Sequence, residues 1–433
     1  MIGQVVIIAG GLGTRMANNT SLPKSLNLIA GKTLFERQIE FFYGKKITQF
    51  LLLLGNLSEP MIEASKQLEE KFPIKISYIV EETPLGTGGA LVNAIPQLER
   101  EFIVIHGDIA IDTDITGLVK SVTEEDWDFA LLYHPSNHPS DSDLLALNEN
   151  QEIIGFFQKP RLTGNYRNQA NSGVYAFRLE VVKKSKQMLK ENNSKKLDLD
   201  RELIPYLLDK GSRVKAVRNL GFVRDCGTRE RLKFVSENWN EVQNSITTRP
   251  AVFIDRDGTL NHLNGFITHP DQLRLVDDAG FFVASINAMG FWVIVITNQP
   301  VIARGEVTRL ELDQIHAKIE SEVAEAGGRI DDFFYCPHHP EKGFPGERLE
   351  LKMVCACRKP EPALIQKAQE IFPINMAKSW MIGDTWRDIE LAQRVGIRSV
   401  LIGELKKGMN EKQLVASNLL AALRIIQESE IVE

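Results

Sequence analysis

Short apolar runs alternate with amphipathic stretches through most of the chain. Strand-sized runs lie at residues 4–9, 50–54, 76–80, 102–106, 291–296 and 380–382. Between the first two of these runs, residues 34–42 carry apolar side chains at helical spacing. This alternation of β and α elements predicts an α/β fold with largely parallel sheets.

The chain is long enough for more than one domain. Its 433 residues, of which 43% are hydrophobic, can form two or three separate cores. Residues 238–250 are polar and lack apolar periodicity, which is typical of a linker. We therefore expect a first domain at residues 1–236, a linker at 237–250 and a second domain at 251–433.

Three further segments complete the expected secondary structure. Residues 181–200 are rich in lysine and asparagine and predict a solvated helix and loop. Residues 201–208 predict a short apolar helix that closes the first domain. Residues 417–427 place apolar side chains at near-helical spacing and predict a C-terminal helix packed on a sheet.

Charge and hydropathy limit the possible partners. A net charge of −6 argues against a nucleic-acid-binding protein, which normally has a basic face. No apolar run reaches the ~18 residues of a membrane span, and the N-terminus lacks a signal-type leader. We expect a cytoplasmic protein whose partners are small molecules, with no nucleic acid and no membrane among them.

The first candidate site follows the apolar run that ends at Ile254. Asp255 and Asp257 are one residue apart, so a strand tip can present both carboxylates to one place. Two carboxylates at one place suit Mg²⁺, which takes oxygen ligands and bridges to phosphates. The alternative is a helix-capping acid and a turn acid before Gly258.

Three later stretches favour the metal-site interpretation. Thr297 and Asn298 follow an apolar run, Lys359 lies in an Arg-Lys-Pro sequence, and Asp384 follows another apolar run, with Asp388 four residues further on. Ligands of a parallel α/β sheet bind at the carboxyl ends of its strands, so these residues are expected at one site.

Together these stretches resemble the haloacid dehalogenase superfamily of phosphotransferases over residues 250–430. The resemblance implies a Rossmannoid domain in which Asp255 is the nucleophile and Asp257 is the general acid and base. It also implies that Thr297 and Lys359 neutralise the phosphoryl group. Mg²⁺ would be bound by Asp255, Asp257 (through its backbone carbonyl) and Asp384. About forty residues between Asp257 and Thr297 leave no room for a large cap domain.

A Cys/His cluster lies between these stretches. Cys336 and His338 form one short pair and Cys355 and Cys357 another, which is typical of a closed, structural Zn²⁺ site. His339 is an alternative ligand, and buried inert thiols are an alternative interpretation of the cysteines.

With this cluster, the second half resembles the D-glycero-D-manno-heptose 1,7-bisphosphate phosphatases and their histidinol-phosphatase relatives. The resemblance implies that Arg358 and Lys359 contact the substrate. The other residues implied to line it are Leu263, Asn264, Gly265, Phe266, Thr297, Asn298, Gln299 and Pro300. Relatives carry Ser-Gly after the Asn-Gln pair, and Pro300 removes a backbone N–H that could bind phosphate.

A second phosphate-binding pattern opens the chain. Residues 10–15 form a glycine-rich loop after the first apolar run, and Lys24 follows in a Leu-Pro-Lys sequence. Successive N–H groups of such a loop can bind a polyphosphate, although a tight strand-to-helix turn is the alternative. A second glycine-rich loop lies at 86–89, and the acids Asp108 and Asp225 follow later.

This set resembles the sugar-1-phosphate nucleotidyltransferases, which have a glycosyltransferase-A-like, Rossmann-type fold, over residues 1–235. The nucleotide-binding residues that it implies are Gly10, Gly11, Gly13, Thr14, Arg15, Lys24, Glu81, Gly86, Thr87, Gly88 and Asp108. Arg15 and Lys24 would also be catalytic, and Asp108 and Asp225 would bind Mg²⁺. The implied sugar-phosphate residues are Gly155, Gln158, Lys159, Asn171 and Gly173. Gln158 replaces the usual glutamate, which predicts altered sugar selectivity.

The two resemblances fit one pathway, because a heptose 1,7-bisphosphate 7-phosphatase yields the 1-phosphate that a nucleotidyltransferase consumes. We therefore expect a bifunctional enzyme of nucleotide-activated heptose synthesis that uses GTP, Mg²⁺ and Zn²⁺. One alternative is a mannose-1-phosphate guanylyltransferase fused to a histidinol-phosphate-type phosphatase. Another is a phosphatase with a nucleotide-sensing N-terminal domain.

Overall fold

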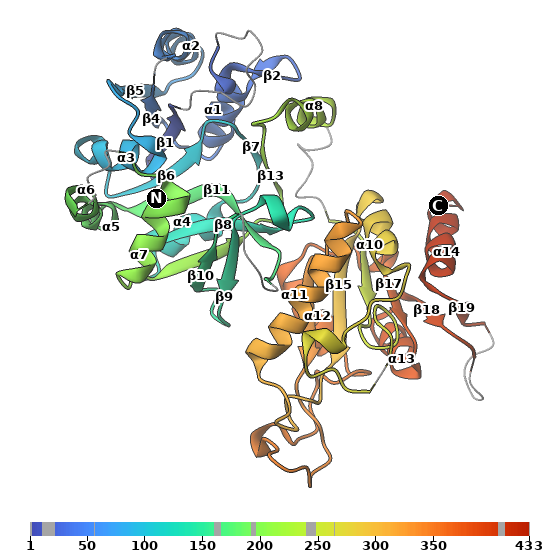
Figure 1. The fold of residues 1–433 in the computed structure, drawn as a ribbon. Helices are drawn as coiled ribbons and strands as arrows, with labels where there is room; N and C mark the ends of the chain where they lie inside the picture. The colour runs from blue at the N-terminus through green and yellow to red at the C-terminus, as the bar shows by residue number, and fades with distance from the viewer. Residues whose placement is uncertain are drawn as a thin grey trace. The chain divides into compact units, whose positions relative to one another are not determined.

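The computed structural model describes residues 2–10, 22–55, 57–159, 166–191, 196–239, 248–263, 265–405 and 412–432 (Figure 1). The chain forms two compact units. Unit 1 contains Met1–His134, Leu145–Gln158 and Asn171–Ile246. Unit 2 contains Thr247–Glu433 together with the short segments Pro135–Leu144 and Lys159–Ala170. The domain boundaries given above remain a prediction.

The N-terminal half is built on a nine-stranded mixed sheet. Its strands are β1 (Gln4–Ala9), β4 (Gln49–Leu54), β5 (Lys75–Val80), β6 (Glu101–His106), β8 (Phe129–Pro135), β9 (Leu144–Leu147), β10 (Ile153–Phe157), β11 (Gln169–Arg178) and β12 (Val214–Arg218). The order β6-β1-β4-β5 is parallel, whereas β11 runs antiparallel to β6. Two small ribbons pair β2 (Leu28–Ile29) with β3 (Lys32–Thr33) and β7 (Ile109–Asp112) with β13 (Phe222–Asp225).

The helices of this half connect or flank these strands. They are α1 (Leu34–Gly44), α2 (Ser58–Lys71), α3 (Gly86–Asn93), α4 (Thr116–Thr123), α5 (Leu179–Lys184), α6 (Lys186–Glu191), the π-helix η5 (Leu199–Leu203), α7 (Ile204–Asp209) and α8 (Arg229–Glu237). Along β1, Val6 and Ile8 pack into one core and Val5 and Ile7 into another. Both faces of the strand are therefore buried, which explains its uninterrupted apolar sequence.

Unit 2 contains a six-stranded sheet in which every pair of neighbouring strands is parallel. In spatial order its strands are β16 (Asp332–Cys336), β15 (Trp292–Asn298), β14 (Ala251–Ile254), β17 (Trp380–Gly383), β18 (Arg398–Ile402) and β19 (Leu414–Ala416). Its helices are α10 (Ala279–Ala288), α11 (Arg309–Glu325), α12 (Ala363–Ile371), α13 (Trp386–Val395) and α14 (Leu419–Val432).

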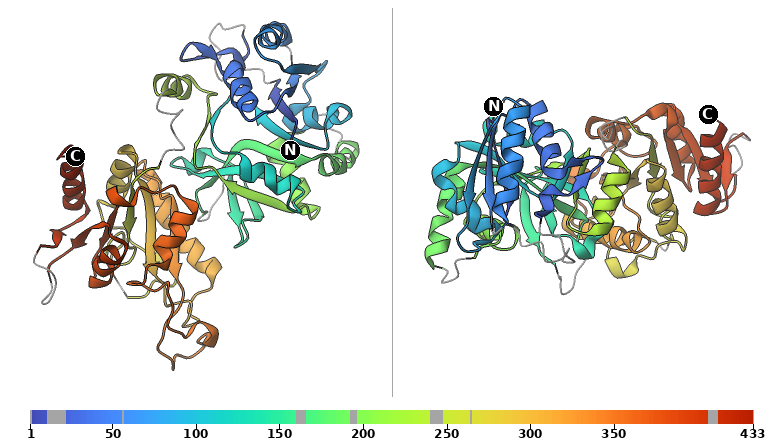
Figure 2. Two further views of the ribbon diagram at one scale, coloured as in Figure 1. Left: turned by 180° about the vertical axis from the view of Figure 1, so that it is seen from behind. Right: turned by 90° about the horizontal axis from the view of Figure 1, so that it is seen from above.

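The direction in which the chain crosses each sheet fixes where a ligand can bind. In unit 2 the chain moves from β14 outward to β15 and β16 and then returns to β17 on the other side of β14. Right-handed crossovers then place α10 and α11 on one face and α12 and α13 on the other (Figures 1 and 2). The strand order reverses between β14 and β17, and in unit 1 between β1 and β6, and such reversals mark ligand-binding crevices.

The predicted α/β class and the strand-sized runs are confirmed. Residues 181–200 and 201–208 contain the predicted helices, but two other predictions about these segments are wrong. Residues 181–200 are not a simple solvated stretch, because Val181, Val182, Leu197 and Leu199 are buried in the core of unit 1. Residues 201–208 lie in η5 and α7 and do not close the first domain, since β12, β13 and α8 follow within unit 1. The predicted C-terminal helix is α14, and its Leu419, Leu423 and Ile426 join the core of unit 2.

None of the helices in the described ranges combines the length and the apolar character needed to cross a bilayer.

Candidate active sites

Three carboxylates meet at the strand-order reversal of unit 2. Asp255 follows β14 and Asp384 follows β17, and the Asp255 N–H donates to the Ile382 carbonyl at 2.9 Å. Asp388 lies in the first turn of α13, where its Oδ2 accepts hydrogen bonds from the Thr385 N–H and hydroxyl. One carboxylate oxygen from each of the three acids lies within 4.8 Å of the others. Asp388, which the sequence analysis left out of the predicted metal set, therefore belongs to the group.

A buried lysine balances part of this charge. Lys359 Nζ lies 2.7 Å from Asp255 Oδ1 and 2.6 Å from Asp388 Oδ1, and the side chain is only 3% exposed. The carboxylates raise the pKa of Lys359 against the opposing effect of burial, so the amine stays charged. Three carboxylates and one ammonium leave a net negative charge, which suits a divalent cation with oxygen ligands.

Burial is the main influence on the predicted nucleophile. It raises the pKa of Asp255 to about 7, with Lys359 opposing and Asp388 and Asp257 adding to the rise. A carboxylate that is both buried and close to other acids is typical of a functional site.

The Asp257 carboxylate is not one of these three. Its carboxylate accepts hydrogen bonds from Arg256 at 2.9 and 2.7 Å, from Asn261 at 3.2 Å and from Gln299 at 2.8 Å. Arg256 is 1% exposed, and sequence reasoning gave it no role. The Asp257 side chain is thus held in one orientation and lies outside the group of three carboxylates.

The predicted substrate residues of unit 2 fall into two sets. Asn298 binds the backbone of Lys359, and Gln299 also donates to the buried Thr297 hydroxyl at 2.9 Å, so both hold candidate catalytic groups. Leu263 and Phe266 are exposed, and their contact with a substrate remains a prediction. Arg358 donates to the His338 carbonyl at 3.2 Å. Pro300 is buried, and Gly265 has φ +79. Asn264 lies outside the described residues.

Two glycines allow the acids to approach the backbone. Gly258 has φ +88, and a Cβ there would lie 2.4 Å from Asp384 Oδ2. A Cβ on Gly383 would lie 2.3 Å from Asp388 Cγ. Any larger residue at these positions would displace a carboxylate of the cluster.

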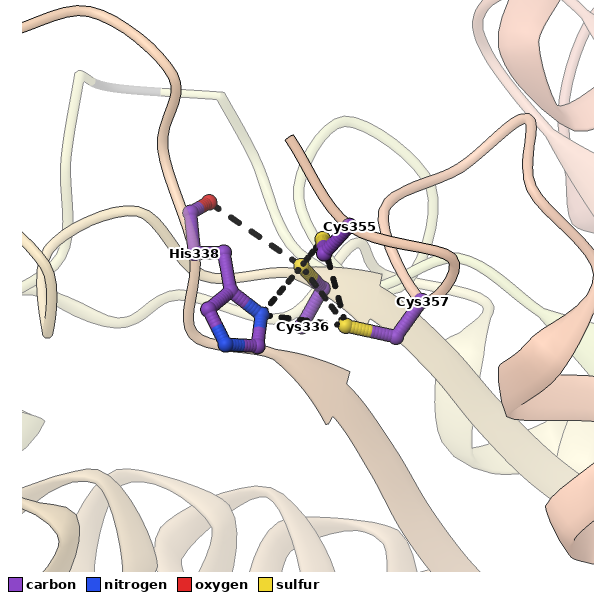
Figure 3. A group of neighbouring side chains, drawn as sticks. All are labelled: Cys336, His338, Cys355 and Cys357. Carbon is purple, nitrogen blue, oxygen red and sulfur yellow. Dashed lines mark hydrogen bonds between the residues drawn. The ribbon is translucent and has the colours of Figure 1, made fainter. Parts of the chain in front are cut away.

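The four residues predicted for the Cys/His cluster lie together, and the alternative ligand His339 is not among them. Figure 3 shows Cys336, His338, Cys355 and Cys357 pointing toward one another. The three sulfur atoms are 3.2–3.5 Å apart, and His338 Nδ1 lies 3.2 Å from Cys357 Sγ. A tetrahedral zinc site with Zn–S bonds of ~2.3 Å needs edges of ~3.8 Å, so a small expansion would admit the ion. Contacts with Cys336, Cys355 and His338 outweigh burial and lower the pKa of Cys357, which favours the thiolate that a metal requires.

The alternative ligand His339 is turned elsewhere. Its Nδ1 accepts a hydrogen bond from the Glu341 N–H at 3.3 Å, and its ring packs edge-on against Phe344. It does not belong to the cluster.

In unit 1 the two predicted acids are neighbours. Asp108 follows β6 and Asp225 ends β13, and the Cys226 N–H donates to the Asp108 carbonyl at 2.7 Å. A Cβ on Gly227 would lie 2.7 Å from Asp225 Oδ1, 3.2 Å from Asp108 Oδ2 and 3.4 Å from Lys24 Nζ. Lys24 Nζ lies 3.7 Å from Asp108 Oδ2. Two carboxylates and a lysine thus converge over Gly227, a donor set that fits a magnesium ion and a phosphate.

The first glycine-rich loop cannot be placed, because Gly11, Gly13, Thr14 and Arg15 lie outside the described residues. Gly10 follows β1, which is one of the two strands at the reversal of strand order in this sheet.

The second glycine-rich loop contacts the chain itself. The N–H groups of Gly88 and Gly89 donate to the Leu197 carbonyl at 2.8 and 2.9 Å, and a Cβ on Gly86 would lie 2.6 Å from that oxygen. The Thr87 hydroxyl accepts a hydrogen bond from the Leu199 N–H at 2.8 Å. These glycines therefore allow the backbone at Leu197 to approach closely, and the Gly88 N–H is hydrogen-bonded to the Leu197 carbonyl. Glu81, whose pKa is raised by burial, accepts a hydrogen bond from the Leu85 N–H.

The predicted sugar-phosphate residues of unit 1 lie near a residue that sequence reasoning missed. Asn171 donates to Asp200 Oδ1 at 2.8 Å, and Gln158 donates to the backbone carbonyl of Arg201, the next residue along η5. Gly155 packs near the Phe157 ring and Gly173 near the His106 ring. Lys159, which falls in unit 2, binds Asp141. Asp200 lies in a stretch whose composition predicted a solvated segment. Its contact with Asn171, a predicted sugar-phosphate residue, is the observation that marks it as a candidate site residue.

Two α/β units, each with acids at the reversal point of its sheet, define a two-site enzyme that acts on phosphate groups. A nucleotidyl transferase family model matches residues 4–241, and a HAD-hydrolase-like model matches residues 356–421. The chain belongs to the nucleotidyl transferase family through its first half, and through its second to the HAD-like family that includes the D-glycero-β-D-manno-heptose-1,7-bisphosphate 7-phosphatases.

Relatives of the second half carry that phosphatase name. The protein from Escherichia coli strain K12 is 36% identical over 143 residues, which are 33% of this chain and 73% of that protein. The one from Yersinia pestis is 34% identical over 176 residues, 40% of this chain and 91% of that protein. Among solved structures, HddC from Yersinia pseudotuberculosis in complex with GMP-PN is 24% identical and covers 55% of this chain and 100% of its own, with a TM-score of 0.46.

Proposed function

We propose that the chain is a bifunctional enzyme of nucleotide-activated heptose synthesis. Its phosphatase would remove the 7-phosphate of D-glycero-D-manno-heptose 1,7-bisphosphate, and its nucleotidyltransferase would then join the resulting 1-phosphate to the nucleotidyl group of GTP. The observation that carries the proposal is the joining, in one chain, of a nucleotidyl transferase domain with a domain similar to heptose-bisphosphate phosphatases. The product of the second domain is the acceptor that the first one needs.

In the phosphatase, Asp255 is the proposed nucleophile. Its carboxylate oxygen would attack phosphorus and form an aspartyl-phosphate while the sugar oxygen leaves. Asp257 would give a proton to the leaving alkoxide and then take one from the water that hydrolyses the intermediate. Arg256, Gln299 and Asn261 support this assignment because they hold the Asp257 carboxylate in a fixed orientation.

The phosphoryl group carries negative charge that the site must neutralise. Lys359 is the proposed fixed cation, since it is buried and already within 2.7 Å of Asp255. Mg²⁺ would be held, directly or through its waters, by Asp255, Asp384 and Asp388. When bound, the ion supplies further positive charge to the phosphate oxygens.

Zinc is proposed as a structural ion of the same unit. Cys336, His338, Cys355 and Cys357 would hold it, and four protein ligands leave no open position for catalysis. Because Arg358 directly follows the last ligand and binds the His338 carbonyl, the ion would order the neighbouring substrate-binding segment.

The nucleotidyltransferase needs no covalent intermediate. A phosphate oxygen of heptose 1-phosphate would attack the α-phosphorus of the nucleotide in line and displace pyrophosphate. Lys24 and a Mg²⁺ bound by Asp108 and Asp225 would neutralise the charge of that transition state, and their convergence over Gly227 supports these roles. Arg15 is proposed for the nucleotide phosphates by resemblance alone.

Product analysis of the purified chain tests the proposal. We expect phosphate release from heptose 1,7-bisphosphate but not from histidinol phosphate, followed by pyrophosphate release when GTP is added. Mass spectrometry should identify GDP-heptose, and parallel reactions with ATP, CTP and UTP establish the base. Transfer to mannose 1-phosphate in preference to heptose 1-phosphate would contradict the sugar assignment. If Lys24→Ala left nucleotide-sugar formation unchanged, the role proposed for Lys24 would be refuted. If the unmodified chain bound GTP but formed no nucleotide sugar, the nucleotide-sensing alternative would replace the proposed transferase.

A further inference from the structure

A partly buried cluster of polar side chains connects three elements beside the predicted sugar-phosphate residues of unit 1. Asp200, from η5, accepts hydrogen bonds at Oδ1 from the Tyr175 hydroxyl and from Asn171 Nδ2, both on β11. Its Oδ2 lies 3.3 Å from Nε2 of His106, the last residue of β6. Burial acts to raise the pKa of Asp200, but the hydrogen bonds from His106, Tyr175 and Asn171 hold it below its ordinary value. Asp200 is therefore a fixed anion at this place.

The cluster determines how the Asn171 amide faces. Its nitrogen donates both hydrogens, one to Asp200 at 2.8 Å and one to the Tyr175 hydroxyl at 2.9 Å. Its oxygen accepts a hydrogen bond from the Gly173 N–H at 3.1 Å and keeps one lone pair. Asn171 can thus accept one more hydrogen bond but cannot donate one, so toward a sugar it would accept from a hydroxyl.

The backbone that carries Asp200 is itself firmly held. The Leu197 carbonyl accepts two N–H groups from the start of α3, and the Asp198 carboxylate caps the N–H groups of Asp200 and Arg201 at 3.0 and 2.9 Å. The Gln158 amide donates to the Arg201 carbonyl. A glutamate at position 158, as in related enzymes, has no proton to donate when ionised. This chain therefore uses its glutamine to fasten the segment that presents Asp200.

We propose that Asp200 is a positioning residue of the sugar-phosphate subsite, which fixes the Asn171 amide oxygen as an acceptor for a sugar hydroxyl. The inference rests on the proposed nucleotidyltransferase function and adds a residue outside the set that the family resemblance implied. It assigns selectivity for the sugar to the neighbourhood of β11 and η5, apart from the group of acids over Gly227.

Steady-state kinetics of the full-length chain test this role, with heptose 1-phosphate and GTP varied separately. Asp200→Asn keeps the shape but removes the charge and allows the Asn171 amide to turn over. We expect the KM for heptose 1-phosphate to rise about tenfold or more, which is the value of one hydrogen bond to a charged group, and the KM for GTP to stay within about twofold. Tyr175→Phe removes the hydroxyl that donates to Asp200 and accepts from Asn171, and it should raise the same KM by about threefold or more.

Asp198→Asn is the matched control, because it is the same substitution two residues away and asparagine is an equally good helix cap. It should behave as the unmodified chain does. Equal rises in both KM values for Asp200→Asn, or a lower melting temperature with unchanged kinetics, would overturn the positioning role. If Asp200→Asn fails to fold, an unchanged KM in Tyr175→Phe decides against it. Absence of transfer by the unmodified chain with any sugar 1-phosphate would instead refute the proposed transferase.

Discussion

Replacing Gly258 by alanine should separate stability from activity in the phosphatase unit. A Cβ at this position would lie 2.4 Å from Asp384 Oδ2 and 2.7 Å from Asp384 Cγ. Ordinary contacts begin near 3.4 Å, so the carboxylate must retreat by about 1 Å. A displacement of this size in a catalytic arrangement costs on the order of 100-fold in rate.

The backbone adds a smaller effect on stability. Gly258 has φ +88, a left-handed conformation that costs a residue with a side chain about 1–2 kcal/mol. We therefore expect Gly258→Ala to fold, to release phosphate from heptose 1,7-bisphosphate about 100-fold more slowly and to need more Mg²⁺ for half-maximal rate. Phosphate release over a Mg²⁺ series and urea unfolding measure these three quantities.

Gly290→Ala is the control for backbone strain. Gly290 has nearly the same angle, φ +85, and a Cβ there would meet no atom within 4 Å. This variant should lose similar stability but keep its phosphatase rate and its Mg²⁺ requirement. If the two variants released phosphate equally fast, the position of Asp384 beside Gly258 would have no role in catalysis and the proposed metal group would be refuted.

Three further predictions concern other parts of the chain. Cys357→Ser should lower the zinc content measured by elemental analysis and slow phosphate release while leaving nucleotidyl transfer intact; retained zinc would contradict the four-ligand site. His316 is fully buried against Phe333, and burial, with nearby arginines, lowers its pKa well below the ordinary value. The unfolded chain then binds the proton more strongly. As the pH is lowered from about 6.5, the free energy of unfolding should therefore decrease by up to ~1.4 kcal/mol per pH unit. His316→Phe should make this decrease smaller when it is measured by urea unfolding. Gln158→Glu should raise the KM for the sugar phosphate and not for GTP, because glutamate cannot donate to the Arg201 carbonyl; an unchanged KM would show that this hydrogen bond is dispensable.

The sequence predicted the strands well because both faces of each central strand are buried. Residues of β1 enter two different cores in alternation, so the run is apolar throughout and needs no periodicity to be recognised. The same topology explains why acids at strand ends could be assigned to shared sites. Carboxyl ends of parallel strands meet at one edge, and Asp255 and Asp384 do so after β14 and β17.

Sequence reasoning failed where composition was averaged over a mixed segment. Polar and charged side chains dominate residues 181–200, yet Val181, Val182 and Leu199 are buried in the core. Asp200 was therefore treated as part of a solvated loop. Asp388 was expected at the site but not as a metal ligand. An acid in the first turn of a helix is ordinarily a cap, and Asp388 does cap α13 here. In both cases the function depends on a neighbour distant in the sequence.

The glycine-rich loops also show what the sequence alone could not predict. A glycine-rich loop before a helix indicates close approach of something to the backbone, but the pattern does not say what. At Gly86 and Gly88 the approaching group is the carbonyl of Leu197, from the chain itself. At Gly227 it is a set of charged groups, Asp108, Asp225 and Lys24, which gather where a Cβ would stand. The second arrangement gathers charged side chains that can bind a ligand, and the first satisfies the chain's own backbone.

Each group of acids is built within one unit, from residues at the strand ends of that unit or beside them. A substitution at Gly258 or Cys357 should therefore change phosphate release without changing nucleotidyl transfer, and one at Asp200 should do the reverse. The two activities thus serve as internal controls for each other in a single preparation. A variant that lost both activities in proportion would report unfolding, and one that lost a single activity would locate the affected chemistry in the unit where the residue lies.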